Sequence, residues 1–160
     1  MKNHQTIALE VEDKPGVLSR ISTLFSRRGY NVDSLTVGHT HLPGISRFTI
    51  VVQGDEAILE QIRKQSQKLI NVLRTENLEK QTSVMREFAI VKMDYNDTSS
   101  QIINGIVDLY GGRMLDSSNG RLIVEFSGTE EKINKIFKDL ESIKVLESIR
   151  TGKLGMRIGL

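Results

Sequence analysis

The sequence contains no cysteine and no tryptophan, and only two of its 160 residues are proline. The absence of cysteine excludes disulfide bonds, thiolate metal ligands and a cysteine nucleophile. No apolar run approaches the ~20 residues needed to cross a bilayer. The first residues, MKNHQTIALEVED, lack the hydrophobic region of a signal peptide. We therefore expect a soluble, cytoplasmic protein with no membrane partner.

The sequence also has no large excess of positive or negative charge. The formal net charge is +2, with 26% charged and 38% hydrophobic residues, which is typical of a globular protein. A nucleic-acid partner normally requires clustered Lys and Arg, so this balance does not indicate one. The length suits one domain or two small ones.

The first half of the chain switches between strand and helix periodicities. From Thr6 to Glu12, apolar and polar residues alternate as in a half-buried strand. The Pro15-Gly16 pair stops this pattern, and an apolar helical stripe follows that ends at Gly29. The later elements are two strands, a helix capped by Asp55 and a last strand, at residues 31–38, 45–53, 58–69 and 71–77.

The same order of elements then repeats. The second set is predicted at residues 86–93, 102–110, 113–116, 121–126, 129–140 and 145–150. Each half thus reads β-α-β-β-α-β, which predicts an α+β fold with two ferredoxin-like domains in tandem. Each domain is an antiparallel sheet of strand order 4-1-3-2, covered on one face by two helices. We place the first domain at residues 1–77, a linker at 78–85 and the second domain at 86–160.

The Pro15-Gly16 pair at the helix start has two interpretations. Proline and glycine favour turns, so the pair can serve only to change the direction of the chain. Glycine also lets a ligand approach the N–H groups of a helix start, which have no partner in the helix and favour a carboxylate or a phosphate. The neighbouring Asp13 argues against phosphate, because two negative groups would crowd one site.

The second strand of the first domain lies at an edge of the predicted sheet. Its unpaired backbone groups invite pairing with a second copy of the chain. We expect this strand to begin at Asn31, near the end of the sheet that carries the first loop, so that a homodimer brings loop and partner strand together. On sequence pattern alone, Asn31 is more typical of a helix exit or a turn than of a binding residue.

The sequence gives little support for metal binding or catalysis. His39 and His41 form an H-x-H pair without an evident third ligand. Asp94, Asp97 and Glu130 are explained as carboxylates of loops and a first helical turn, and His4 as a solvated terminal residue. The sequence has no Ser/His/Asp arrangement and no nucleotide-binding glycine motif.

RNA-recognition modules share the same order of elements. Their sheets carry aromatic residues that stack on bases. Here aromatics make up 5% of the chain, and the third strand, ISRFTIVV, contains only Phe48. Composition therefore disfavours an RNA-binding function.

Several stretches of the sequence resemble one family. VEDKPGVLSRISTLFSRRGYNVDSLTVG followed by PGISRFTIVVQGD is similar to the ACT domain of the acetolactate synthase (acetohydroxyacid synthase) small, regulatory subunit. The similarity continues through QSQKLINVLR, REFAIVKM and LIVEFSGTEEKINKIFKDL to KVLESIRTGKLGMRIG. It therefore covers nearly the whole chain, and it implies that the first domain is an ACT domain.

The resemblance also implies a function. It indicates a non-catalytic subunit that forms a homodimer and binds a branched-chain amino acid, expected to be valine, between paired ACT domains. Such a subunit activates a large catalytic subunit and confers feedback inhibition on the biosynthesis of valine, isoleucine and leucine. The cofactors thiamine diphosphate, FAD and magnesium belong to the large subunit, so this chain is expected to hold none.

The family's effector-binding residues fall on Asp13, Gly16, Val17 and Leu18, with Asn31 on the facing strand. The N–H groups of residues 16–18 would hold the effector's carboxylate, and the side-chain carbonyl of Asn31 would accept from its ammonium. The family commonly has asparagine in place of Asp13, whose carboxylate can pair with the ammonium or repel the carboxylate. The segment LYGGRML is also richer in glycine than the family pattern.

A free-standing ACT-type amino-acid sensor that regulates another enzyme is the alternative. Co-purification with a thiamine-dependent large subunit separates the two functions.

Overall fold

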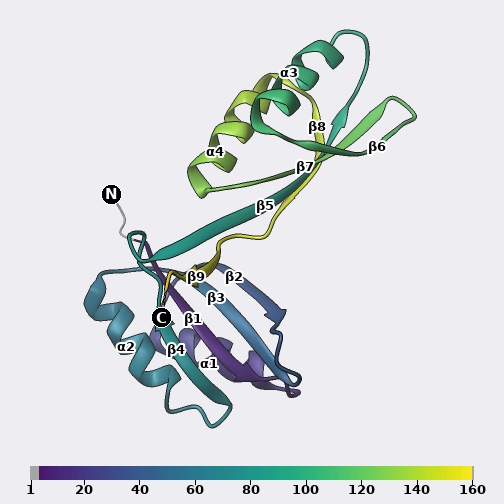
Figure 1. Cartoon of the computed structure of the whole chain (residues 1–160). Helices are drawn as coiled ribbons and strands as arrows, with labels where there is room; N and C mark the ends of the chain where they lie inside the picture. The colour runs from purple at the N-terminus through teal and green to yellow at the C-terminus, as the bar shows by residue number, and fades with distance from the viewer. Residues whose placement is uncertain (1–3, 160) are drawn as a thin grey trace. The chain divides into compact units, whose positions relative to one another are not determined.

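The computed structural model describes residues 4–159, which form two compact units (Figure 1). Unit 1 comprises the residues up to Met85 together with those from Lys153 onward, and unit 2 comprises Arg86–Gly152. The predicted domain ranges also include residues 1–3 and 160, which lie outside the described part of the chain.

Unit 1 is an antiparallel sheet with two helices on one face (Figure 1). In chain order its elements are β1 (His4–Glu12), α1 (Val17–Arg28), β2 (Val32–His39), β3 (Ile45–Gln53), α2 (Glu56–Ser66) and β4 (Val72–Asn77). The strand order β2-β3-β1-β4 confirms the predicted arrangement. Since β1 and β2 both pair with β3 in the antiparallel sense, they run in the same direction.

The helix-facing side of this sheet forms the core of unit 1. Alternate residues of β1 and β3 point toward the helices and are buried: Ile7, Leu9, Val11, Phe48, Ile50 and Val52. Helix α1 packs Val17, Ile21 and Phe25 against them. Each such side chain contributes about 1.5–3 kcal/mol by leaving water, so this face holds the unit together.

The end of α1 and the start of α2 lie where the sequence indicates, whereas α2 ends at Ser66 and not at the predicted residue 69. The Asp55 carboxylate accepts a hydrogen bond of 2.9 Å from the N–H of Ile58, which caps α2. Gly29 ends α1 with a φ of 68°, in the left-handed region that glycine adopts without strain. Arg27 and Arg28 occupy the last turn of α1, where their positive charges interact favourably with the helix dipole.

Unit 2 repeats the same topology. Its elements are β5 (Ser83–Asp94), α3 (Ser100–Tyr110), β6 (Arg113–Ser118), β7 (Arg121–Gly128), α4 (Glu130–Asp139), the 3-10 turn η1 (Leu140–Ser142) and β8 (Val145–Arg150), with strand order β6-β7-β5-β8. Strand β5 begins in unit 1 and continues into unit 2. The two tandem βαββαβ units confirm the predicted fold class.

The glycine pair of LYGGRML has a packing role in unit 2. Gly111 ends α3 with a φ of 63°. A Cβ on Gly112 would lie 2.5 Å from the ring of Phe126 and 3.0 Å from Val124, both of which are buried. Glycine at 112 therefore lets the chain pass close to the core.

The last residues of the chain belong to a different unit from the one that we predicted. We placed residues 78–85 in a linker and 153–160 in the second domain, whereas the structure groups both segments with unit 1. A short strand, β9 (Leu154–Arg157), pairs with β5, and the N–H of Ile158 donates to the carbonyl of Thr82 at 2.8 Å. Four residues are too few for an alternation to identify a strand, so pairing with β5 is what defines it.

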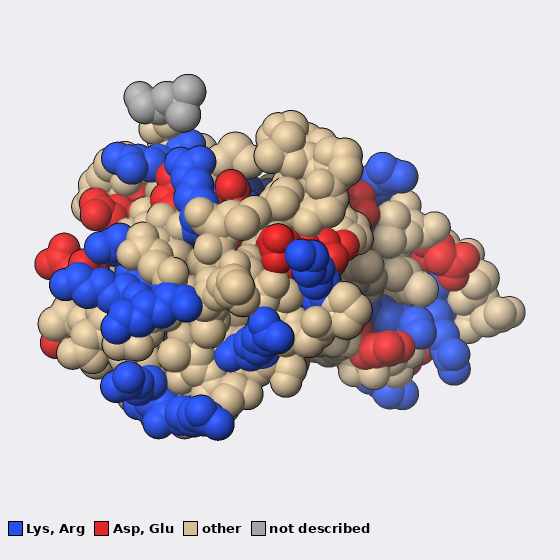
Figure 2. Space-filling model, turned by 90° about the horizontal axis from the view of Figure 1, so that it is seen from below, with Lys and Arg blue, Asp and Glu red and all other residues tan. Residues whose placement is uncertain are grey.

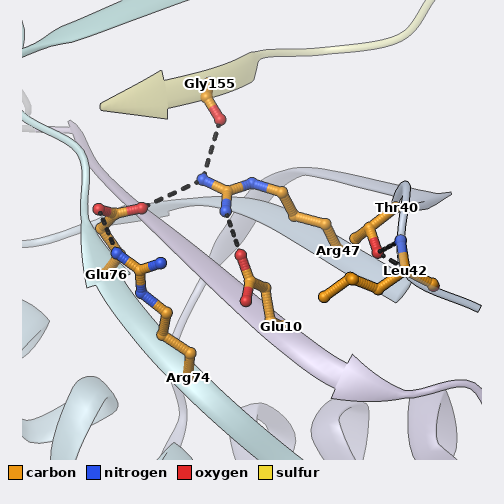
Figure 3. A network of polar contacts seen from close by, with 7 residues as sticks. All are labelled: Glu10, Thr40, Leu42, Arg47, Arg74, Glu76 and Gly155. Carbon is orange, nitrogen blue, oxygen red and sulfur yellow. Dashed lines mark hydrogen bonds and ion pairs between the residues drawn. The ribbon is translucent and has the colours of Figure 1, made fainter. Parts of the chain in front are cut away.

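The side of the unit 1 sheet away from the helices carries a network of ion pairs (Figure 3). The Arg47 guanidinium on β3 lies 3.1 Å from the Glu10 carboxylate on β1 and 3.3 Å from that of Glu76 on β4. It also donates to the carbonyl of Gly155 at 3.2 Å, which holds β9 over the sheet. Arg74 reaches the other oxygen of Glu76 at 3.4 Å. One cation therefore joins three strands and the returning end of the chain.

We expect Arg47→Met to destabilise the protein by about 2 kcal/mol, because two carboxylates would lose the cation between them. The loss is smaller than for a fully buried pair, since the Arg47 side chain is 19% exposed. Arg74→Met is the matched control. Its side chain is 56% exposed, so it should cost under about 0.5 kcal/mol. Urea unfolding followed by circular dichroism measures both, and equal losses would contradict the role given to Arg47.

Candidate functional site

The loop between β1 and α1 leaves the start of the helix bare. Gly16 is the N-cap residue, with φ 85° and ψ −7°, and it offers no side chain to the first turn. Within the described residues, no acceptor meets the N–H groups of Gly16 and Leu18, whereas the N–H of Val17 donates to the Lys14 carbonyl at 3.3 Å. An added Cβ at Gly16 would meet nothing within 4 Å. The helix start is therefore open to an anionic group.

Hydrogen bonds to neighbouring segments hold this loop in place. The N–H of Asp13 donates to the Gly44 carbonyl at 2.8 Å. Asn71 donates to the Glu12 carboxylate at 2.6 Å, and the Lys14 ammonium lies 3.1 Å from the same oxygen. These two contacts, that of Asn71 above all, lower the pKa of Glu12. The Lys14 ammonium is thereby paired with Glu12.

The Asp13 side chain faces the end of β2. Its Oδ2 lies 3.4 Å from Nδ1 of His39, the last residue of that strand. The Ser46 hydroxyl lies 3.5 Å from the same ring nitrogen. His39 thus lies beside the loop, a position that its interpretation as half of an H-x-H pair without a third ligand did not anticipate. One clue was available: β1 and β2 run in the same direction on either side of β3, so the residues that follow β1 and the end of β2 lie at the same end of the sheet.

Asn31 lies at the other end of the sheet. Its carbonyl accepts from the N–H of Gln53 at 3.1 Å, and Gln53 is paired with His4 at the start of β1. The side-chain amide nitrogen of Asn31 is 3.5 Å from the Asp33 carboxylate, which also accepts from Gln53 Nε2 at 2.8 Å. His4 is 2.7 Å from Asp33, so it takes part in this cluster rather than being a freely solvated residue.

The predicted site residues therefore form two groups within one chain. Asp13, Gly16, Val17 and Leu18 lie at the start of α1, and Asn31 follows its end. The helix has 12 residues, which separates its ends by about 18 Å. The expectation that Asn31 lies near the first loop is wrong. β1 and β2 run in the same direction on either side of β3, so the start of β2 and the end of β1 lie at opposite ends of the sheet.

The side chains in the first group differ in exposure. Val17 is 5% exposed and packs in the core, so its side chain cannot reach a ligand. Leu18 is 49% exposed and can contribute apolar contact. The site at the helix start thus consists of backbone N–H groups, an exposed leucine and a carboxylate paired with a histidine.

An apolar groove lies next to Asn31. It has a volume of about 300 Å³ and runs between α1 and β2, lined by Ile21, Ser22, Phe25, Ser26, Tyr30, Val32, Leu35 and Ile50. Strand β2 is at the sheet edge, with β3 as its only neighbour within the described sheet. Its helix-facing side chains Leu35 and Val37 stay 37% and 45% exposed. This edge therefore presents both unpaired backbone and apolar side chains.

A second hollow, of about 390 Å³, is basic. Arg20, Arg27 and Arg28 of α1 border it together with Ser19, Thr23, Leu24 and Leu69. In the view from below, many Lys and Arg side chains gather on one side of the molecule (Figure 2). Arg20 donates to the Asn71 side-chain carbonyl at 2.6 Å. This hollow contains none of the predicted site residues.

The remaining residues that we considered as metal ligands or catalytic groups make ordinary structural contacts. Within residues 4–159, no group of three or more His, Asp or Glu side chains could hold a metal ion. Asp94 lies 3.8 Å from Lys144, the Asp97 carbonyl accepts from Ser100 at 3.4 Å, and Glu130 is in the first turn of α4. No helix in the described part of the chain is long and apolar enough to span a membrane.

The comparison with known families decides the relationship of this chain. Residues 7–74 match the family described as the AHAS small subunit-like ACT domain, and residues 86–159 match the small subunit of acetolactate synthase. The chain belongs to the acetolactate synthase small-subunit family. The acetolactate synthase small subunit of Mycolicibacterium smegmatis is 42% identical over 154 residues, which cover 96% of this chain and 91% of the relative.

Two further members of the acetolactate synthase small-subunit family support this assignment. That of Mycobacterium avium is 45% identical over 147 residues, which cover 91% of this chain and 87% of the relative. The crystal structure of the Thermotoga maritima acetolactate synthase small subunit superimposes with a TM-score of 0.93 at 34% identity and covers 99% of each chain. The first domain is thus an ACT domain, as the sequence resemblance indicated.

Proposed function

We propose that this chain is the regulatory subunit of an acetolactate synthase, with no active site of its own. In this proposal it binds a branched-chain amino acid, with valine as the first candidate, at the start of α1. The observation that carries the proposal is the open helix N-terminus at Gly16, whose N–H group and that of Leu18 are free to hold a carboxylate.

The separation of Gly16 from Asn31 requires two copies of the chain. If β2 pairs with the β2 strand of a second copy around a twofold axis, the two strands run antiparallel. Because β2 ends beside the Gly16 loop, the start of the second copy's β2 then lies next to that loop. Asn31 of the partner subunit thus reaches the bare helix start. The proposed homodimer has two equivalent sites, each built from both chains.

An amino acid has the right chemistry for such a site. Its carboxylate accepts from the free N–H groups of Gly16 and Leu18. Its ammonium donates to the side-chain carbonyl of the partner's Asn31, whose amide nitrogen is directed toward Asp33. The groove of about 300 Å³ beside Asn31 is apolar, so it favours an aliphatic side chain such as that of valine, isoleucine or leucine.

The catalytic chemistry in this proposal belongs to a large subunit. That partner would carry thiamine diphosphate, FAD and magnesium, and this chain would activate it and make it sensitive to the amino acid. A compact effector that binds only the assembled site can change the activity of a partner by shifting an equilibrium between two states.

Reconstitution tests the proposed function. The purified chain is mixed with the acetolactate synthase large subunit of the same organism, and acetolactate formation is measured with and without valine. We expect the chain to raise the activity and valine to lower it again. A chain that binds valine but neither binds nor activates the large subunit would support the alternative of a free-standing amino-acid sensor.

A further inference from the structure

The carboxylate of Asp13 creates a difficulty for the proposed site. It lies in the loop that precedes the bare helix start, where the effector's own carboxylate must approach. Two close carboxylates repel each other, and the repulsion grows as the site loses water. In the proposed site the effector's ammonium is held by the partner's Asn31, so a further positive charge is needed to offset Asp13.

His39 is the residue placed to supply this charge. Its Nδ1 is 3.4 Å from the Asp13 carboxylate. Strand alternation gives it the same face as Leu35 and Val37, the face toward α1. The Ser46 hydroxyl, which His39 contacts, belongs to β3 and lies on the same side of the sheet. The imidazole therefore lies between the helix start and the open edge of β2.

Two other basic residues near His39, Lys14 and Arg47, are already paired. Lys14 in the same loop lies 3.1 Å from Glu12. Arg47, the residue after Ser46 on β3, points to the opposite face and contacts Glu10 and Glu76. His41 belongs to the exposed turn that follows β2. Asp13 is thus the carboxylate that His39 faces within the described residues.

We infer that His39 is a further residue of the effector site, whose imidazolium neutralises Asp13 and makes amino-acid binding depend on pH. This inference rests on the proposed function and adds to it a determinant of affinity. Histidine is the side chain that changes charge between about pH 5 and 8, a range in which a free amino acid keeps both its carboxylate and its ammonium. When His39 is protonated, the Asp13–His39 pair is neutral and admits the effector's carboxylate. When His39 is neutral, Asp13 repels it.

The sign of the pH dependence follows directly. Affinity for the amino acid is high at low pH, where His39 carries its proton, and it falls as the pH rises and the proton is lost. The position of His39 at the end of β2 also puts it next to the partner's Asn31 in the proposed dimer. Pairing of the two β2 strands would remove water from this end, so the charge balance matters more there than on the open surface.

Titration calorimetry of the full chain with L-valine tests this inference. We expect the Kd of the wild type to rise roughly fivefold between about pH 5.5 and about pH 8. His39→Gln should bind at every pH as weakly as the wild type does at high pH. Asp13→Asn should bind at every pH at least as tightly as the wild type does at low pH.

The double variant distinguishes the loss of a neutralising charge from a general disruption of the binding site by the substitution of His39. Asp13→Asn combined with His39→Gln should recover the affinity of Asp13→Asn alone, because without the carboxylate no cation is needed. His41→Gln is the matched control, and its Kd for L-valine should change with pH as that of the wild type does. Circular dichroism and solution mass confirm that each variant is folded and dimeric.

Several outcomes would overturn the inference. They are a valine affinity of the wild type that does not change with pH, a His39→Gln variant with wild-type behaviour, or a double variant as weak as His39→Gln. Absence of valine, isoleucine and leucine binding at every pH would instead overturn the proposed function, and this inference with it.

Discussion

Replacing Gly16 with aspartate is expected to abolish both the binding of valine and the feedback inhibition that it causes. The new carboxylate would stand at the helix start, where the effector's carboxylate is proposed to bind. Two such charges about 4 Å apart repel by ~1 kcal/mol in water and by ~4 kcal/mol at the lower effective dielectric of a protein surface. The second figure corresponds to a loss of affinity approaching a thousandfold. Calorimetry and inhibition of the reconstituted enzyme measure the two effects.

Gly16→Asn separates charge from conformation. Gly16 has a φ of 85°, so any side chain there adopts the left-handed region at a cost of roughly 1 kcal/mol. Aspartate and asparagine share this cost and nearly the same shape, and an added Cβ meets nothing within 4 Å. We expect Gly16→Asn to lose no more than about tenfold in affinity, and both variants to activate the large subunit. Equal losses for the two variants would contradict an anion site.

Replacing Leu35 with lysine is expected to dissociate the dimer and, with it, to remove effector binding. Leu35 lies in the middle of β2 and is 37% exposed in a single chain. In the proposed dimer it lies near the twofold axis, so two lysines would meet where two leucines did. We expect a dimer dissociation constant at least ~100-fold higher, from lost apolar burial and added repulsion.

Leu73→Lys is the control for the edge-strand dimer. Leu73 is on β4 at the opposite edge of the same sheet and is 55% exposed. We expect it to leave the solution mass and valine affinity unchanged. Sedimentation equilibrium at micromolar concentration with and without valine measures both variants. A Leu35→Lys chain that stays dimeric and binds valine would show that β2 is not the interface.

Much of the fold was predictable because local signals and tertiary packing agree in this chain. The alternation from Thr6 to Glu12 coincides with β1, and Gly29 ends α1 where a terminal glycine was expected. Asp55 caps α2 through its side chain. In each case the residue that starts or ends an element also satisfies its backbone, so the sequence pattern and the structure have the same physical cause.

The predicted domain ranges differ from the structure where distant segments meet. β9 is defined by its pairing with β5, and it is held by the contact between Arg47 and the Gly155 carbonyl. Neither contact leaves a periodic pattern in the sequence. One consequence is that cutting the chain after Asn77 would also remove parts of unit 1, namely residues 78–85 and the final segment.

The bare start of α1 was predictable from the sequence, but the arrangement of the residues around it was not. The bare Gly16 followed from the Pro-Gly pair before a helical stripe. The position of Asn31 required knowing that β1 and β2 run in the same direction, and the contact of His39 with Asp13 depends on two segments 26 residues apart (39 − 13). Such contacts are set by the sheet register, which a single sequence specifies only through the complete fold.

A test with mixed dimers addresses most directly the claim that each effector site is shared by two chains. Gly16→Asp and Asn31→Ala chains with different tags are co-expressed, and the mixed dimer is isolated by both tags. Each variant alone should fail to bind valine. In the mixed dimer, the intact Gly16 loop of one chain meets the intact Asn31 of the other. We predict one valine bound per mixed dimer with an affinity close to that of the wild type, whereas a mixed dimer without binding would contradict a shared site.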